Sequence, residues 1–241
     1  MAKKDMGSVF GVISSASYNR IHIIEKELNK RLSVLVLDAL DGLCVIPFAK
    51  SGNSVDCYET EKVYIDGGEI NGFKILYGLK DKLEYYELSN NTNIINNNFF
   101  NEKNNKQYDF VYVNKCINYD KYNDITMDKK IKKILKSVNL NGYLFLSYYL
   151  AINEKDYNNY PKNQFTRRGE MIKYFGENWE VLSMREDYKL TKEKPNPIHP
   201  LGIEYVICYI FAKKINNNKK YIYHYNYVPL LSVKFEEVDL T

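Results

Sequence analysis

The sequence has few cysteines, and none of them is spaced for metal binding or for redox chemistry. The four cysteines are far apart and form no Cys-x-x-Cys pair. Three of them lie in apolar, strand-like runs, where a free thiol behaves as a small hydrophobic group. The sequence therefore predicts no disulfide bond, no structural zinc or other metal site, and no secreted disulfide scaffold.

Long apolar runs and a strong charge excess are also lacking. No window approaches the roughly 18 consecutive apolar residues that a membrane span needs, and no stretch of signal-peptide length follows the lysines of residues 1–10. We expect a cytoplasmic protein without a membrane contact. The net charge is only +4, and Lys and Arg are spread along the chain, so no nucleic-acid partner is expected.

The length and composition fit one globular α/β domain. The 241 residues include 45% hydrophobic residues, which is enough for a core. We expect a domain over residues 1–214 and an extension over residues 215–241 that packs on it. Tyrosines alternate in that extension as in a strand, and Asn-rich runs such as residues 96–98 read as loops.

Apolar patterns alternate between helix and strand along the chain. Ile21–Leu32 has helical spacing, and Val34–Leu37 is a continuous run typical of a buried parallel strand. A turn over residues 38–42 leads to a helix that Gly52 closes, and Ser54–Tyr58 is the next strand. The later predicted elements are strands over Tyr108–Val113, Tyr143–Tyr149, Trp179–Arg185 and Ile203–Phe211, helices over Ile131–Leu135 and Thr166–Phe175, and an Asn141-Gly142 turn.

This alternation predicts a doubly wound α/β fold with a mostly parallel sheet. In such sheets, ligands bind beyond the carboxyl ends of the strands. Three places qualify: the turn after Leu37, Glu59 after the second strand, and residues 114–116 after the Tyr108–Val113 strand. Glu59 follows Gly42 by 17 residues, close to the roughly 20 expected of an acid that binds ribose hydroxyls. Together these places favour a nucleoside cofactor.

Motifs along the chain add a family resemblance. They are Arg20-Ile21-His22, Gln107–Val111, Asn141–Tyr143, Phe165–Glu170, Tyr174-Phe175, Trp179, Glu186-Asp187 and Phe211–Lys214. In these motifs, the chain resembles the class I S-adenosylmethionine-dependent methyltransferases, and among them the small-molecule branch with tellurite and thiopurine-type enzymes. The resemblance implies a Rossmann-like, seven-stranded sheet with an antiparallel last strand, S-adenosylmethionine as cofactor and a small-molecule acceptor.

The first motif departs from the family pattern. Aligned without a gap, Asp38, Leu40 and Gly42 fall on the family's Gly-x-Gly-x-Gly, so only the last glycine is kept. Glycine lets the backbone approach a ligand closely and adopt positive φ. Either the loop has shifted, or Asp38 meets the methionyl ammonium, or the site binds another molecule. A two-residue deletion would instead put Asp38 on the motif's usual acid.

The resemblance also implies roles for other residues. Glu59 would hold the ribose hydroxyls, Tyr58 would pack beside the adenosine, and Asn114 and Lys115 would border the methionine portion and the acceptor. The catalytic residues are unknown, with His22 and His199 as candidates. The alternative function is a non-catalytic methyltransferase-like binding or partner protein with a decayed cofactor loop.

Overall fold

The computed structural model describes residues 6–11, 13, 15–103, 106–151, 165–215 and 222–223. The chain divides into two compact units. The first contains Met1–Asn104 and Glu193–Ile203, and the second contains Asn105–Lys192 and Glu204–Thr241. Within the described residues, no helix combines the length and the apolar character that crossing a membrane requires.

Three parallel strands form the sheet of the first unit. They are β1 (Ser33–Leu37), β2 (Ser54–Tyr58) and β5 (Thr92–Ile95), side by side in that order. The last four residues of both β1 and β2 are buried, as the predicted continuous apolar runs require. Both of these predicted strands are confirmed. Leu37 pairs with Tyr58, so the segments after β1 and β2 leave the sheet at the same edge.

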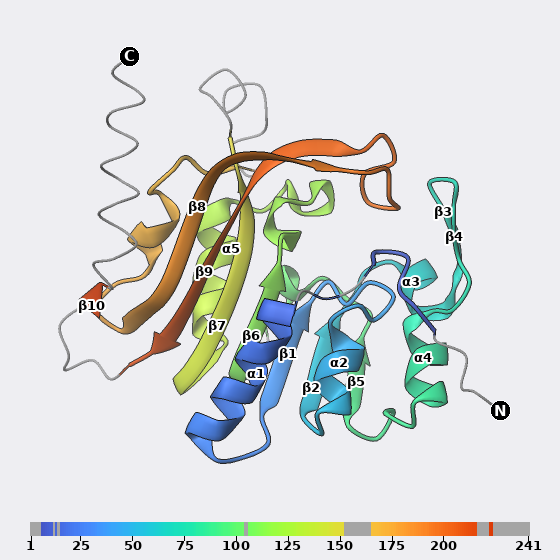
Figure 1. The fold of residues 1–241 in the computed structure, drawn as a ribbon, viewed down its shortest axis with the longest axis horizontal. Coiled ribbons are helices and arrows are strands. Elements are labelled where there is room, and N and C mark those ends of the chain that lie inside the picture. Colours follow the sequence, from blue (N-terminus) through green and yellow to red (C-terminus); the bar gives the residue numbers. More distant parts are fainter. Residues whose placement is uncertain are drawn as a thin grey trace. The chain divides into compact units, whose positions relative to one another are not determined.

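Two helices flank these strands in the sequence. The helix α1 (Ser15–Leu28) starts earlier and ends sooner than the predicted Ile21–Leu32. It ends because Asn29 has a φ of 50°, a left-handed conformation that terminates α-helices. The helix α2 (Val45–Lys50) covers β2 (Figure 1), and Gly52 follows it with a φ of 83°, as predicted.

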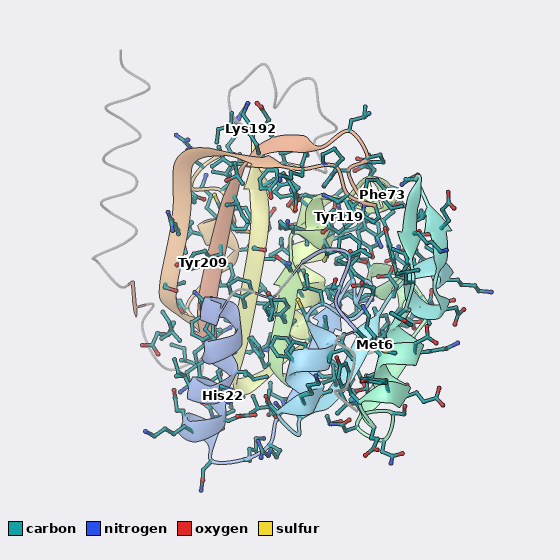
Figure 2. All side chains as sticks on the ribbon, turned by 45° about the vertical axis from the view of Figure 1, so that its right-hand side comes forward. Met6, His22, Phe73, Tyr119, Lys192 and Tyr209 are labelled. Carbon is teal, nitrogen blue, oxygen red and sulfur yellow. The ribbon has the colours of Figure 1, made fainter. Side chains whose placement is uncertain are left out.

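The segment between β2 and β5 holds elements that the sequence pattern does not reveal. They are α3 (Lys62–Asp66), the hairpin of β3 (Gly68–Ile70) and β4 (Phe73–Ile75), and α4 (Leu79–Tyr85). The helices α3 and α4 contact each other. The hairpin rises beside α4 in Figure 1, and Figure 2 labels Phe73 on it.

In the Asn-rich stretch, residues 96–98 form a loop as predicted, between β5 and a short 3-10 helix, Phe99–Asn101, neither of which was predicted. Its asparagines satisfy carbonyl groups of neighbouring turns. The Asn91 side chain donates to the carbonyls of Ala49 and Asn53, each at 3.0 Å. Asn96 donates to the carbonyl of Glu59 at 2.8 Å. Such side-chain bonds replace ladder bonds where a strand ends.

The sheet of the second unit has the order β10-β8-β9-β7-β6. The strands are β6 (Tyr108–Asn114), β7 (Val138–Leu150), β8 (Trp179–Glu193), β9 (Ile203–Lys214) and β10 (Ile222–Tyr223). The pair β6 and β7 is parallel, and β9 runs antiparallel to β7. The strands predicted for β6, β7, β8 and β9 are confirmed, and all are longer than predicted. The predicted α/β class, with a mostly parallel sheet and a late antiparallel strand, is also confirmed.

The predicted Asn141-Gly142 turn is wrong, because both residues lie inside β7. Asn141 has a φ of 64°, and the pairing register with β6 shifts between Tyr108 and Phe110. A Cβ on Gly142 would come within 3.0 Å of the carbonyl oxygens of Asn139 and Tyr108. The pair therefore accommodates a bulge at the start of the strand, where backbone approaches backbone closely.

The helix α5 (Met127–Lys136) confirms the helix predicted around residues 131–135. The Thr126 side chain accepts the N–H of Lys129 at 3.4 Å and caps the helix. Asp128 in the first turn and Lys136 in the last complement the helix dipole. Helix α5 contacts β7.

The predicted helix Thr166–Phe175 with Thr166 as its N-cap is wrong. Thr166 bridges to Leu150, and only the 3-10 helix Met171–Tyr174 follows. Gly169 has a φ of 70°, which an α-helix excludes. The predicted strand of alternating tyrosines lies outside the described residues, apart from β10, which pairs in parallel with β8.

Candidate functional site

The turn after β1 has a positive φ at alternate positions. Asp38, Leu40 and Gly42 have φ values of 55°, 50° and 97°. These are the three positions that the ungapped comparison assigns to glycines. A residue with a side chain pays roughly 1–2 kcal/mol for this left-handed conformation. The first two positions therefore hold a glycine-like backbone without glycine, and Asp38 is buried there.

Glu59 lies at the end of β2 and binds this turn. Its Oε2 accepts the backbone N–H of Leu40 at 2.8 Å. Its Oε1 accepts the N–H groups of Thr60 and Glu61 at 2.8 Å and 3.0 Å. The residue is 0% exposed. The carboxylate that the sequence assigns to ribose is thus bonded to three backbone amides of the protein.

Asp41 and Lys82 form a buried ion pair in the first unit. The Lys82 Nζ donates to Asp41 Oδ2 at 2.9 Å and to the Asp41 carbonyl at 2.8 Å. Asp41 is 0% exposed and Lys82 is 2% exposed. Lysine is almost never buried to this extent without a partner, so this pair fixes α4 to the turn after β1.

The N-terminal segment also binds Asp41. Ser8 Oγ donates to Oδ1 at 2.6 Å, and the N–H of Val9 donates to Oδ2 at 2.9 Å. Phe10 packs edge-on against the Tyr64 ring at 5.5 Å. Met6, which Figure 2 labels, donates its N–H to the Tyr86 hydroxyl at 3.4 Å. The Asp41 carboxylate therefore accepts hydrogen bonds from the N-terminal segment and from α4 together.

The side chain of Leu40 lies in an apolar cluster. Leu40, Tyr64 and Ile75 form the buried centre, and four partly buried side chains pack against them. These are Phe10, Val63, Ile70 and Ile198. The cluster joins the N-terminal segment, α3, the hairpin and the Pro-rich loop over residues 194–202. In a family glycine loop, no side chain would stand at this position.

Tyr58 is buried in the core of the first unit. Its ring is 3% exposed and meets the Phe99 ring edge-on at 5.1 Å. The contact joins the end of β2 to the segment after β5 and belongs to the core. Tyr58 beside the adenosine stays a prediction.

The two histidine candidates lie in different elements of the first unit. His22 is exposed on α1, and its Nδ1 is 3.1 Å from Glu25 Oε2. His199 is partly buried in the Pro-rich loop, where its backbone N–H donates to Asn196 Oδ1 at 3.0 Å. Asn71 on the hairpin donates to the carbonyl of Pro197 at 2.8 Å and ties this loop down.

Asn114 and Lys115 lie at the carboxyl end of β6 in the second unit. Ser147 Oγ donates to Asn114 Oδ1 at 2.9 Å. Lys115 has a φ of 64°, and its Nζ is 3.5 Å from the Tyr205 hydroxyl. The same Nζ lies 5.5 Å and 5.9 Å from the ring centres of Tyr205 and Tyr149, within cation–π range. Their roles toward a cofactor or acceptor stay predictions.

A second buried carboxyl group lies in the second unit. Glu186 on β8 accepts the Tyr148 hydroxyl at 3.0 Å and the N–H of Gly169 at 2.9 Å. Burial raises the pKa of Glu186 above its ordinary value. The bonds from Gly169 and Tyr148 and the charge of Arg168 lower this pKa, and Glu170 raises it. This carboxyl group holds the turn over residues 167–170 to the sheet.

Three residues that the structure brings together were not predicted as site residues: Ser8, Asp41 and Lys82. One signal could have found Lys82. Leu79, Lys82 and Leu83 share a helix face at i, i+3 and i+4, so the lysine stands among apolar positions. No local pattern pairs Ser8 with Asp41, because these residues meet only in the folded chain.

No family model matches the chain, and no curated protein matches its sequence. Solved structures do match the fold. TehB from Haemophilus influenzae has a TM-score of 0.57 at 15% identity, covering 83% of this chain and 63% of TehB. The chain thus spans less than two thirds of TehB. The [4+2]-cyclase SpnF has a TM-score of 0.58 at 9% identity, covering 87% of this chain and 84% of SpnF.

A putative sarcosine dimethylglycine methyltransferase from Galdieria sulphuraria is also similar. Its TM-score is 0.54 at 13% identity, and the match covers 88% of this chain and 94% of that one. The chain therefore has the class I, Rossmann-like methyltransferase fold. Because one neighbour with this fold is a cyclase, the fold alone does not fix the reaction.

Proposed function

We propose that the chain binds S-adenosylmethionine at the turn after β1 and transfers its methyl group to a small-molecule acceptor. The observation that carries the proposal is the backbone of Asp38, Leu40 and Gly42, which has positive φ at all three positions of the family's glycine loop. The fold shared with methyltransferases supports it.

The backbone at the carboxyl ends of β1 and β2 is placed where such a cofactor would bind. Leu37 and Tyr58 are paired, so the turn and Glu59 lie at one sheet edge, where nucleosides bind in this class of fold. A carboxylate has about four acceptor positions. The three amides on Glu59 occupy three of them, so a ribose hydroxyl would share this carboxylate with the protein backbone.

The side chains around the turn after β1 have to move before a cofactor can bind there. Glu59 is 0% exposed, and Leu40 is packed in its apolar cluster. A ligand therefore has to displace side chains around Leu40 before it reaches the carboxylate. The contacts of Ser8 and Phe10 are the ones that a short N-terminal movement can release, because Ser8 is partly buried and Val9 is 41% exposed.

The cofactor, when bound, supplies an electrophilic methyl group on a sulfonium. Transfer of that group to a soft or anionic acceptor needs little acid–base help, and most of the rate comes from alignment. The task of the protein is then to orient the ribose through Glu59 and the methionyl end through the turn. This division of labour requires no catalytic dyad.

Titration with S-adenosylhomocysteine tests the proposal. A ligand that binds only the folded state stabilises it by about 2.7 kcal/mol at a hundredfold excess over Kd. We expect a rise in Tm and measurable binding heat, with S-adenosylmethionine behaving in the same way. Adenine alone serves as a control for weak aromatic binding. No heat and no Tm shift at millimolar ligand would reject this function.

The second candidate is a non-catalytic binding protein with the same fold. The full burial of Glu59 and the position of Leu40 favour it. The two candidates differ at Asp38. If Asp38 pairs with the cofactor's ammonium group, Asp38→Ala loses affinity. If Asp38 and Leu40 block a decayed site, the double change Asp38→Gly with Leu40→Gly gains affinity.

A further inference from the structure

We infer that Lys82 is a positioning residue that holds the backbone of the turn after β1 in its positive-φ conformation, on which cofactor binding depends. The inference rests on the proposed function and deepens it. Lys82 comes from α4, a helix outside the motifs that carry the family resemblance. It reaches the turn by two hydrogen bonds, one to the side chain and one to the backbone of Asp41.

The bond to the carbonyl matters because it fixes the peptide between Asp41 and Gly42. That peptide lies between the two positive-φ residues Leu40 and Gly42. Without glycine, the left-handed conformation at Leu40 is intrinsically unfavourable. A charged donor that binds the Asp41 carbonyl fixes the orientation of the peptide that precedes Gly42, and so holds in place the residue that follows Leu40.

Helix α4 also contacts the turn through its apolar side. A Cβ on Gly42 would lie 3.0 Å from Leu79 Cδ1, so the helix approaches the Gly42 backbone closely. Leu79 and Lys82 lie three residues apart on one helix face. Leu79 therefore packs on the turn, while Lys82 bonds to it.

Glu59 and Lys82 bind neighbouring residues of the turn from different elements. Glu59, at the end of β2, accepts the N–H of Leu40, and Lys82, on α4, donates to the carbonyl of Asp41. A buried ion pair contributes little net stability because burying the charges is costly. Net stability therefore does not account for the Asp41–Lys82 pair, whereas a role in setting the conformation of this turn does.

The test compares Lys82→Met with Leu83→Ala. Methionine keeps the apolar stem and removes the ammonium group. Leu83 is buried on the same helix, so its truncation destabilises α4 without removing the bonds to Asp41. Two quantities are measured: the affinity for S-adenosylhomocysteine, and hydrogen exchange by NMR of the Leu40 amide relative to the Val36 amide within β1. The exchange ratio separates local opening of the turn from global unfolding.

We expect Lys82→Met to weaken binding about tenfold or more and to speed Leu40 exchange, relative to Val36, by a similar factor. Leu83→Ala should leave both within about threefold of the wild type. Equal affinity and an unchanged exchange ratio in Lys82→Met would overturn the inference and leave the proposed function standing.

If the wild type does not bind the ligand, the proposed function fails, and the exchange ratio alone decides the positioning role. A raised ratio supports it, and an unchanged ratio overturns it. If Lys82→Met does not fold, Asp41→Asn combined with Lys82→Met removes both buried charges. The same two measurements on that variant then decide.

Discussion

The Glu59 carboxylate accepts the backbone N–H of Leu40 at 2.8 Å and so joins the ends of two neighbouring parallel strands. This bond makes Glu59 a structural group in the ligand-free protein, whatever it does for a ligand. It also explains how a leucine keeps a φ of 50° next to the sheet.

Glu59→Gln should lower the free energy of unfolding by about 1–3 kcal/mol, because one backbone amide loses its buried acceptor. Glutamine has one oxygen, and its amide nitrogen cannot accept the N–H of Leu40. Urea unfolding measures the loss. Glu61→Gln is the matched control, since that partly buried side chain accepts none of the three backbone amides held by Glu59, and it should stay within about 0.5 kcal/mol. Equal stabilities for the two variants would contradict this prediction.

Leu40→Ala should destabilise the protein by about 2–5 kcal/mol, because it empties a buried apolar position. Leu40→Gly removes the same contacts and one methyl group more, and at most other positions it would be the less stable variant. At a φ of 50°, we expect the glycine variant to be more stable than the alanine variant by about 1 kcal/mol. Thermal denaturation of both variants decides, and the reverse order would show that the turn relaxes out of this conformation.

Stability should depend on pH through Glu186. Burial raises the pKa of Glu186 in the folded protein. At pH values above the ordinary pKa, this carboxyl group therefore loses its proton in the unfolded chain but keeps it in the folded protein. The free energy of unfolding then falls as the pH rises from about 4.5 through the raised pKa. Glu186→Gln lacks this titration. Urea unfolding from pH 4 to 8 should show the wild type losing stability relative to the variant, and a constant difference would be evidence against the shift.

Strands β1, β2 and β6 to β9 could be predicted because their apolar signal is local. A run such as Val34–Leu37 is apolar on both faces of the strand, and this continuity is visible in the sequence without knowledge of what packs against it. The turn at Gly52 and the helix α5 were also predictable, because both depend on residues that are close in the sequence. The predicted turn at Gly142 and the predicted helix through Gly169 were wrong, because tertiary contacts decide the role of these glycines. Gly142 serves a bulge and Gly169 serves a turn held by Glu186.

The candidate site was only partly predictable. The position of Glu59 follows from strand spacing, but its three amide partners depend on how the turn folds back. Ser8, Asp41 and Lys82 meet over separations of 33 and 41 residues. A single sequence carries no pattern that pairs these residues with one another, although the apolar helix positions around Lys82 mark that lysine by itself.

The Pro-rich loop has a consequence for the order in which the chain can fold. Residues 193–203 belong to the first unit, yet residues 105–192 of the second unit precede them in the sequence. Asn71 and Pro197 are 126 positions apart, and Ile198 packs on the cluster of Leu40. During synthesis from the N-terminus, the first unit lacks these contacts until residues 105–192 of the second unit have left the ribosome. Closure of so long a loop is slow compared with local contacts, so the surroundings of Leu40 stay incomplete on the nascent chain.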